Sequence, residues 1–581
     1  MDSEKSYRNT LRLWTEDNYF DALTRQELLA ITDPKELEDR FYMDLEFGTA
    51  GLRGVLGAGT NRMNRYVIRK VTQGLADMIL AYGQQACLRG VVIAYDNRRF
   101  SREFALETAL VLATNKVKAF LFESLRPTPE LSFAVRYLGT IAGVNITASH
   151  NPKEYNGYKV YWEDGGQIPP LQAEQIALKM AETTCWEVYP MDENAAREAG
   201  LLTIVGPEVD AAYESEIQKT LLSPNLTRTE GKNLKIVFTP LHGTGGIPVQ
   251  RALQNMGFTS LWTVPEQEQP DPEFATVNSP NPEDPSAFIM ALNLAKEKEA
   301  DLVLATDPDA DRVGIYARDR QGAWIRFTGN QIGVILEYYV LSQKNAQGTL
   351  PENGVVVKTV ASTDLGDAIA MDFGMKAINV HVGFKYIGEQ IRKMEEGWGT
   401  FLFGFEESHG YLAGTYARDK DAVQAAALLA EAALYFSRIQ NKTLPEVLEH
   451  IFKRYGTYLD EQVAVTLSGK QGKESIDRIM DRLRVMKPNT LGGLRLEKIE
   501  DYQIDTRLWL ATGRREMIGL PQANVLRFSF EGGGYVMVRP SGTEPKIRFY
   551  FCLKGQTMVE AEAMKERVKA QIFSAVDDLM R

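Results

Sequence analysis

Cysteine is scarce in this chain, and its scarcity excludes a disulfide-stabilised scaffold. Only three cysteines (Cys87, Cys185 and Cys552) occur among 581 residues, and no two of them form a C-x-x-C pair. This usage favours a reducing compartment. The first residues also lack the basic and apolar pattern of a secretory signal. We therefore expect a cytoplasmic protein.

Long apolar runs are absent as well. No run reaches the roughly 18 apolar residues that a membrane helix needs. The most apolar helical stretch, residues 422–436, is interrupted by Gln424 and Glu431. It predicts a buried helix of a globular domain, and we expect no membrane partner.

Positive charge is in deficit. Lysine and arginine total 66 against 77 aspartates and glutamates, a net charge of −11. General nucleic-acid binding relies on the opposite balance, so we expect no nucleic-acid partner. Small anionic ligands remain compatible with local basic clusters. Neither a Walker A motif nor a G-x-G-x-x-G fingerprint is present, so nothing indicates a nucleotide as phosphoryl donor.

The remaining composition is that of a globular α/β protein. Hydrophobic residues (Ala, Val, Ile, Leu, Met, Phe, Trp, Tyr and Cys) make up 44% of the chain, and charged residues make up 25%. With 581 residues, the chain is long enough for about four domains. Short apolar runs alternate with helical patterns, which predicts mostly parallel strands throughout. Composition breaks divide the chain into residues 1–205, 206–323, 324–455 and 456–581. Strands are expected at the ranges 90–95, 234–238, 301–305, 354–359 and 400–403.

The first loop that indicates chemistry spans residues 145–152, Asn-Ile-Thr-Ala-Ser-His-Asn-Pro. Ser149 lies among small residues beside His150, which is typical of a nucleophile or a phosphorylation site. The alternative is an Asn-Pro turn after a strand. No G-x-S-x-G elbow surrounds Ser149, which disfavours an α/β-hydrolase.

The second loop carries three carboxylates and an arginine. Asp307, Asp309 and Asp311 are spaced so that they can converge on one hard cation. An EF-hand is excluded, because Arg312 occupies the position where that loop needs glycine. Three carboxylates with room for a phosphate oxygen suit Mg²⁺, and the alternative is a solvated acidic turn.

The third loop is residues 404–410, which include Glu406, Glu407, Ser408 and His409. Carboxylates beside a serine and a histidine offer the acceptors and donors that sugar hydroxyls need. The alternative is a polar turn.

The fourth loop combines hydroxyls, glycine and two arginines. Ser541, Gly542 and Thr543 lie between Arg539 and Arg548. Backbone N–H groups and guanidinium groups in this arrangement predict a phosphate clamp, and the alternative is a basic hairpin. A phosphate clamp, a metal loop and a serine without a nucleotide site predict internal phosphoryl transfer, with the serine as carrier.

These four loops, in this order, resemble those of the α-D-phosphohexomutase superfamily, the phosphoglucomutase/phosphomannomutase enzymes. Residues 147–152 match the phosphoserine loop, 307–312 the metal loop, 406–408 the sugar-specificity loop and 539–545 the phosphate-binding loop. Phe405 departs from the family pattern, because it separates Gly404 from the paired glutamates. The long chain and residues before Phe47 resemble the branch with glucomutases, phosphopentomutases and glucose-1,6-bisphosphate synthases.

The resemblance implies a fold of four domains in a heart-shaped architecture around a central cleft. Three α/β domains are similar, and the C-terminal α+β domain diverges. Residues 1–205 would hold an N-terminal extension and domain I, residues 206–323 domain II, residues 324–455 domain III and residues 456–581 domain IV.

The resemblance also implies a site. Mg²⁺ would be held by a phosphoserine oxygen of Ser149 and by Asp307, Asp309 and Asp311. His150 and Lys159 are the candidates for acid–base catalysis, and Arg312 joins the catalytic group. The substrate-binding candidates are Arg53, Lys385, Glu406, Ser408, Arg539, Ser541, Gly542, Thr543 and Arg548.

The activity that we expect is interconversion of glucose 1-phosphate and glucose 6-phosphate, with glucose 1,6-bisphosphate as intermediate and activator. The alternatives are a phosphopentomutase, a phosphomannomutase, a glucose-1,6-bisphosphate synthase and a binding protein without catalysis. Intact Ser149 and an intact aspartate triad disfavour the last of these. The partner is a small phosphorylated sugar, and the protein is expected to be a monomer or a weak homodimer.

Overall fold

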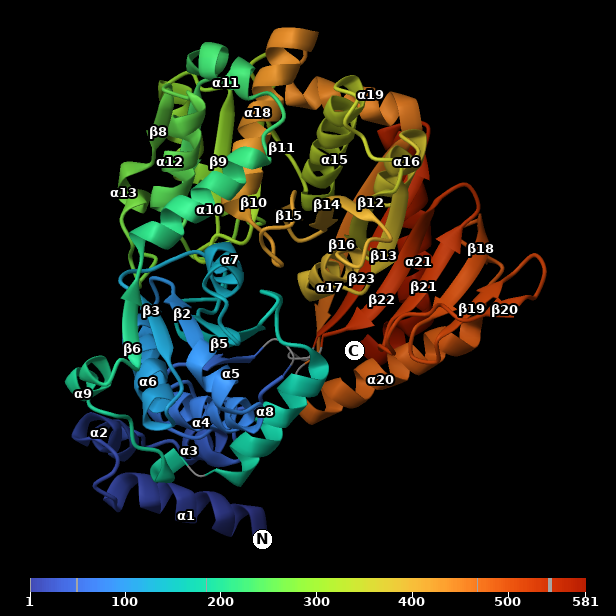
Figure 1. The fold of residues 1–581 in the computed structure, drawn as a ribbon. Coiled ribbons are helices and arrows are strands. Elements are labelled where there is room, and N and C mark those ends of the chain that lie inside the picture. Colours follow the sequence, from blue (N-terminus) through green and yellow to red (C-terminus); the bar gives the residue numbers. More distant parts are fainter. Residues whose placement is uncertain (1, 49–50, 184, 468, 542–545, 581) are drawn as a thin grey trace. The chain divides into compact units, whose positions relative to one another are not determined.

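The computed structural model describes residues 2–48, 51–183, 185–467, 469–541 and 546–580, drawn as a ribbon in Figure 1. The chain forms two compact units, each described here by itself. The first comprises residues 1–327, 387–401 and 409–441, and the second comprises residues 328–386, 402–408 and 442–581.

The first sheet lies in the first unit and has the strand order β1-β5-β4-β2-β3-β6. Strands β4, β2, β3 and β6 run parallel, whereas β5 pairs antiparallel with both β4 and β1. The central strands are buried along their whole length, as strands covered on both faces must be. The strands are β1 (Leu52–Val55), β2 (Val91–Tyr95), β3 (Ala119–Phe122), β4 (Ala142–Ile146), β5 (Tyr155–Trp162) and β6 (Leu202–Val205).

Helices cover this sheet, and α4 carries apolar residues at the spacing of one helical face. Val67, Val71, Leu75 and Met78 are all buried on α4, in one cluster with residues of α6 and α8. Leu131 of α7 packs instead beside Gly143 of β4. The helices are α4 (Arg65–Ala81), α5 (Gln84–Arg89), α6 (Ser101–Thr114), α7 (Thr128–Leu138), α8 (Pro170–Glu182) and α9 (Glu193–Glu198).

The residues before the first sheet form a helical layer of their own. Trp14, Phe20 and Phe41 are buried against one another and against Tyr66 of α4. The Tyr66 hydroxyl also donates to Asp21 (3.1 Å), so the segment is fastened to the domain by both apolar and polar contacts. Its helices are α1 (Asp2–Glu16), α2 (Ala22–Ala30) and α3 (Pro34–Phe41).

The second sheet also lies in the first unit, with the order β11-β10-β9-β7-β8. Strands β9, β7 and β8 run parallel, and β10 and β11 continue the sheet antiparallel. Gly257 ends α12 with a φ of 101°, a left-handed conformation that glycine adopts readily. The elements are β7 (Ile236–Thr239), β8 (Leu261–Thr263), β9 (Leu302–Thr306), β10 (Val313–Arg318), β11 (Trp324–Arg326), α10 (Pro207–Lys219), α11 (Pro224–Glu230), α12 (Gly246–Met256), α13 (Pro265–Glu268) and α14 (Ile289–Glu297).

The third sheet has the order β13-β12-β14-β15. Its longest apolar helix, α18, begins behind an Asp421 side chain that accepts from the Gln424 N–H. Of the described helices, α18 alone has the length and apolarity of a membrane span, but 78% of that window is buried inside the protein. The predicted buried helix is thus confirmed. The elements are β12 (Gly354–Thr359), β13 (Lys376–Val380), β14 (Thr400–Glu406), β15 (Gly410–Leu412), α15 (Gly329–Ala346), α16 (Leu365–Asp372), α17 (Phe384–Met394), α18 (Ala422–Gln440) and α19 (Leu444–Tyr455).

The fourth sheet lies in the second unit and is antiparallel. The mostly parallel strands predicted from the alternation of apolar runs and helical patterns are therefore wrong for this part, whereas the α+β character that the resemblance implied for the C-terminal domain is confirmed. The consecutive pairs β18–β19, β19–β20, β21–β22 and β22–β23 are joined without an intervening helix among the described residues, and such directly connected neighbours run in opposite directions. The elements are β16 (Thr457–Thr466), β17 (Thr490–Leu491), β18 (Leu494–Asp501), β19 (Thr506–Trp509), β20 (Arg515–Glu516), β21 (Leu526–Phe530), β22 (Gly534–Pro540), β23 (Lys546–Gly555), α20 (Gly469–Met486) and α21 (Met558–Met580).

Asp460 of β16 gives this sheet a pH-dependent stability. Burial raises the pKa of its carboxyl group to about 7, and its Oδ1 is enclosed without a hydrogen bond. The unfolded carboxyl group ionises near pH 4, so folding is penalised increasingly as the pH rises from about 4 to about 7. We expect Asp460→Asn to raise the apparent Tm by a few degrees at pH 8 and to leave it unchanged at pH 4. Thermal unfolding of both proteins across this range measures the effect, and equal pH profiles would contradict it.

Candidate active site

Ser149 lies in the loop between β4 and β5, which pair antiparallel. The residue is 3% exposed, and its φ of 51° is in the left-handed region, which is rare for a residue other than glycine. Its backbone N–H donates to the Thr147 hydroxyl (2.8 Å). The loop therefore fixes the serine in one conformation.

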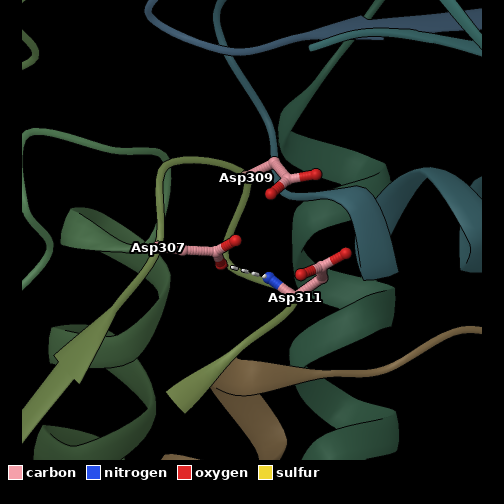
Figure 2. A group of neighbouring side chains, drawn as sticks. All are labelled: Asp307, Asp309 and Asp311. Atoms are coloured by element: carbon pink, nitrogen blue, oxygen red, sulfur yellow. Dashed lines mark hydrogen bonds between the residues drawn. The ribbon is translucent and has the colours of Figure 1, made fainter. Parts of the chain in front are cut away.

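The aspartate loop follows β9 and precedes β10. Asp307 Oδ1 accepts from the backbone N–H groups of Asp311 (3.1 Å) and Arg312 (3.0 Å), and Figure 2 shows the first of these bonds. Ala310 adopts a φ of 50°, which closes the turn. The three aspartates are buried, and each offers one oxygen within 4.8 Å of the others. The loop thus converges three carboxylates on one point.

The two loops meet within the first unit. The Ser149 hydroxyl donates to Asp307 Oδ2 (2.8 Å) and lies 3.2 Å from His150 Nδ1. The Thr128 hydroxyl at the start of α7 donates to Asp309 Oδ2 (2.7 Å), and the Thr128 N–H donates to the Asp309 carbonyl (2.9 Å). Strand ends from two sheets therefore bring a serine, a histidine and a carboxylate triad together, as expected for loops at carboxyl ends of strands.

Lysines balance the charge of the triad. Lys159 Nζ lies 2.7 Å from Asp309 Oδ2 and 3.6 Å from Asp311 Oδ2, and Lys420 Nζ lies 2.9 Å from Asp311 Oδ2. Burial alone would lower the pKa of Lys159, but the two carboxylates raise it above its ordinary value. Burial and the neighbouring carboxylates raise the pKa of Asp307. The site is a compact arrangement of alternating charges.

The donor set fits a divalent cation. Asp309 Oδ1 and Asp311 Oδ1 are buried and accept no hydrogen bond from the described residues. Unpaired buried carboxylate oxygens are costly unless a cation or a donor approaches them. Hard oxygen ligands of this kind suit a divalent cation such as Mg²⁺.

His150 and the arginines complete this group. Loss of solvation, followed by the positive charges of Arg312 and Arg53, holds the pKa of His150 well below its ordinary value. The imidazole is therefore neutral at pH 7. Arg312 Nη1 pairs with Glu283 Oε1 (2.6 Å), and Arg53 Nη1 donates to Asn151 Oδ1 (2.8 Å). Every catalytic and metal-site residue predicted from the sequence lies in this cluster, and their roles stay predictions.

Lys420 is a member of the cluster that the sequence reading missed. It belongs to the segment Arg418-Asp419-Lys420-Asp421, which resembles a solvated charge run but is buried. Asp419 accepts from the Tyr161 hydroxyl (2.8 Å), and Asp421 accepts from the Tyr213 hydroxyl (2.8 Å). The signal that could have indicated burial of this charged segment is its position directly before the apolar helix α18, because the start of a buried helix is enclosed by its neighbours.

The remaining candidates lie in the second unit, except Arg53. Ser408 donates to Glu406 Oε1 (3.0 Å), and the Thr359 hydroxyl donates to Glu407 Oε2 (2.9 Å). Burial and the charge of Glu406 raise the pKa of Glu407 to about 7. Lys385 lies over the Tyr386 ring at 5.0 Å, and burial and the nearby Arg539 lower its pKa.

The two clamp arginines are cross-strand partners. Arg539 of β22 lies opposite Arg548 of β23, and the Ser541 N–H donates to the Lys546 carbonyl (2.7 Å). Both guanidinium groups therefore leave the sheet on the same face. The predictions for Gly542 and Thr543 lie outside the described residues.

Phe405, the departure from the family pattern, lies in the interior of the second unit. It is fully buried, and a Cβ atom built on Gly333 or Gly366 would lie 2.4 Å or 3.1 Å from its ring. The departure from the family pattern thus fills a space left by two glycines. His409, directly after the loop, has a φ of 62°, and burial lowers its pKa to about 4.

This fold and this cluster define a phosphohexomutase, and comparison with known proteins places the chain in a family. Models of the phosphoglucomutase/phosphomannomutase domains match in order: α/β/α domain I at residues 44–185, domain II at 211–322, domain III at 328–455 and the C-terminal domain at 480–571. The chain belongs to this family of phosphotransfer isomerases. The exact boundaries at 205, 323 and 455 stay predictions.

Individual relatives agree with this assignment. The chain is 38% identical to a phosphoglucomutase of Staphylococcus haemolyticus over 89% of its own length and 91% of that protein. It shares its fold with the Paramecium phosphoprotein parafusin, a phosphoglucomutase (TM-score 0.70, 18% identity, 92% and 96% of the two chains). Aspergillus fumigatus N-acetylphosphoglucosamine mutase, solved with GlcNAc-6P and magnesium, has the same fold at a TM-score of 0.51 (13% identity, 99% of each chain).

Proposed function

We propose that the protein is a phosphoglucomutase that interconverts α-D-glucose 1-phosphate and glucose 6-phosphate through a phosphorylated Ser149. The observation that carries this proposal is the 2.8 Å hydrogen bond from the Ser149 hydroxyl to Asp307 of the buried triad. It sets the serine oxygen beside a cation site, which is where a phosphoserine needs its charge offset. The 38% identity with a phosphoglucomutase supports glucose as the sugar.

Asp307, Asp309 and Asp311 would hold Mg²⁺ together with a phosphoserine oxygen. When bound, this ion would neutralise charge that develops on the transferred phosphoryl group. Lys159 pairs with Asp309 and Lys420 pairs with Asp311, so the two lysines offset negative charge at the site and hold these side chains in place. Phosphoryl transfer depends mainly on such positioning and charge stabilisation.

A proton must leave the sugar hydroxyl that attacks the phosphoserine, and a proton must be delivered to the Ser149 oxygen when that oxygen leaves the phosphoryl group. His150 is neutral and its Nδ1 lies 3.2 Å from the serine oxygen, which suits a general base. Lys159 is held in its charged form by Asp309 and Asp311. A raised pKa makes the ammonium group a weaker acid, so Lys159 suits charge stabilisation, and Arg312 would stabilise phosphate charge nearby.

The second unit would hold the sugar and its non-reacting phosphate. Carboxylates Glu406 and Glu407 beside Ser408 offer acceptors and a donor for sugar hydroxyls. Arg539 and Arg548 would bind the distal phosphate in a forked geometry, with Lys385 adding positive charge. Because one clamp serves either phosphate, two orientations of the bisphosphate can use one reactive serine.

The proposed function includes an activator, a cellular compartment and an oligomeric state. Glucose 1,6-bisphosphate would act as activator, because it rephosphorylates a serine that has lost its phosphate. We propose a cytoplasmic enzyme that acts on a small phosphorylated sugar as a monomer or weak homodimer.

The first test is an assay of the purified protein with Mg²⁺ and a trace of glucose 1,6-bisphosphate. Glucose 1-phosphate, mannose 1-phosphate and ribose 1-phosphate are compared by kcat/KM. Glucose 1-phosphate is expected to give the highest value. A higher value for ribose 1-phosphate would keep the phosphoserine chemistry and replace the proposed substrate with a pentose phosphate.

Arg548→Ala tests the phosphate clamp. Loss of charge-assisted hydrogen bonds to phosphate is expected to raise KM about 10- to 100-fold, while saturating glucose 1,6-bisphosphate still phosphorylates Ser149 to the same extent. Steady-state kinetics and intact-protein mass measure the two effects. Arg495→Ala is the control, because Arg495 lies on the same sheet with 78% of its side chain exposed. An unchanged KM in Arg548→Ala would remove the clamp assignment.

A further inference from the structure

Arg98 is a fully buried arginine between β2 and α6, and the sequence reading did not single it out. Its side chain has 0% exposure, as does that of its partner Asp96. A buried guanidinium group is costly unless its donors are satisfied. Where those donors point therefore indicates what the residue does.

The guanidinium group of Arg98 donates to backbone carbonyls of the Ser149 loop. Nη1 donates to the carbonyls of Pro152 (2.8 Å) and Tyr155 (3.0 Å). Nη2 donates to the carbonyls of Ser149 and Asn151. Four carbonyl groups within seven residues thus share one planar donor group, and a lysine ammonium cannot reproduce this fork.

The guanidinium group of Arg98 is itself held in place by Asp96 and Phe274. Asp96 Oδ2 lies 3.2 Å from Arg98 Nε, and Asp96 Oδ1 accepts from the Arg98 N–H (2.9 Å) and the Ser101 hydroxyl (2.7 Å). The guanidinium carbon lies 5.2 Å from the centre of the Phe274 ring. Arg98 therefore has a fixed position from which it fixes the loop.

The loop needs such support at two points. Ser149 has a φ of 51°, a conformation that is unfavourable for a non-glycine residue and persists only where its surroundings enforce it. Asn151 uses its side chain to accept from Arg53 (2.8 Å). By holding the carbonyls of both residues, Arg98 acts on the serine and, through Asn151, on a candidate substrate arginine.

We infer that Arg98 is a positioning residue that holds Ser149 in the orientation required to accept and return a phosphoryl group. The inference rests on the proposed phosphoserine function. It adds a residue that touches neither metal nor sugar but on which the geometry of transfer depends, since displacement by about 1 Å costs phosphoryl transfer orders of magnitude in rate.

The experiment compares Arg98→Ala with Arg126→Ala after wild-type mutase activity has been established. Arg126 is a matched control: its side chain is 11% exposed and pairs with Asp210 (2.7 Å) in the same unit, and its described side-chain partners do not include residues 149–155. Both variants are expected to lose Tm. Below their Tm, only Arg98→Ala should lose kcat, by 100-fold or more, together with its rate of Ser149 phosphorylation, while KM changes less than threefold.

Guanidinium ion supplies the specific readout. At 10–50 mM it is expected to restore kcat of Arg98→Ala at least tenfold, and to leave Arg126→Ala unchanged. Should Arg98→Ala not fold, Arg98→Lys decides, because it keeps the charge opposite Asp96 but not the fork, and the same loss of kcat is expected. A folded Arg98 variant with kcat within threefold of wild type would overturn the inference. An inactive wild type would instead contradict the proposed function.

Discussion

Ser149→Ala is expected to lower kcat by at least 10⁴-fold, to the background rate, while glucose 6-phosphate still binds. Removal of a nucleophile that forms a covalent intermediate has effects of this order. The hydroxyl donates to Asp307 and lies beside His150, but no described contact of the second unit's candidate groups depends on it. Coupled-assay kinetics and calorimetric binding measure the two quantities.

Phosphopeptide mapping after incubation with glucose 1,6-bisphosphate gives an independent check. Wild type should carry phosphate on Ser149 and the variant none. Ser342→Ala is the control, since its hydroxyl donates only locally to the Tyr339 carbonyl (3.1 Å). Activity of Ser149→Ala within tenfold of wild type, or phosphate on another residue, would refute the phosphoserine mechanism.

Asp309→Asn is expected to lower kcat/KM about 10³-fold and to weaken Mg²⁺ binding at least tenfold. An asparagine keeps one acceptor oxygen but removes a ligand charge, and it also removes the ion pair with Lys159 Nζ at 2.7 Å. Calorimetric titration of the protein with Mg²⁺, without substrate, reports the site independently of activity.

The control for this prediction is Asp319→Asn. Asp319 Oδ1 accepts from the N–H groups of Gln321 (2.9 Å) and Ala323 (2.7 Å), bonds that an asparagine oxygen can also make. The control therefore removes the same charge from the same domain without touching the triad. Equal Mg²⁺ affinities in Asp309→Asn and wild type would place the metal elsewhere.

Local sequence was sufficient to predict elements whose signals are local. The aspartate spacing at 307, 309 and 311 predicted a converging loop, because the turn between β9 and β10 places alternate side chains inward. The apolar stretch at 422–436 predicted a buried helix, because this signal also lies within one continuous segment of the chain. The alternation of apolar runs and helical patterns did not predict the antiparallel fourth sheet. Short apolar runs do not reveal whether the connecting chain crosses over or turns back.

Arg98 and Lys420 were missed because burial of a charge depends on distant partners. Arg98 is enclosed by residues 149–155, some fifty positions away. Lys420 reaches Asp311 from a segment held by Tyr161 and Tyr213. Viewed along the chain, both are members of ordinary charged runs, and only their surroundings give them a function.

The chemical groups available to this protein are encoded locally: a serine, a carboxylate triad and paired arginines, each on a loop whose turn its own residues specify. Which of these groups share a site depends on the packing of the folded chain. The Ser149 hydroxyl and Asp307 are 158 positions apart yet 2.8 Å apart in space. That distance is set by the packing of two sheets and by buried clamps such as Arg98, whose stabilising contacts exist only once the chain is folded.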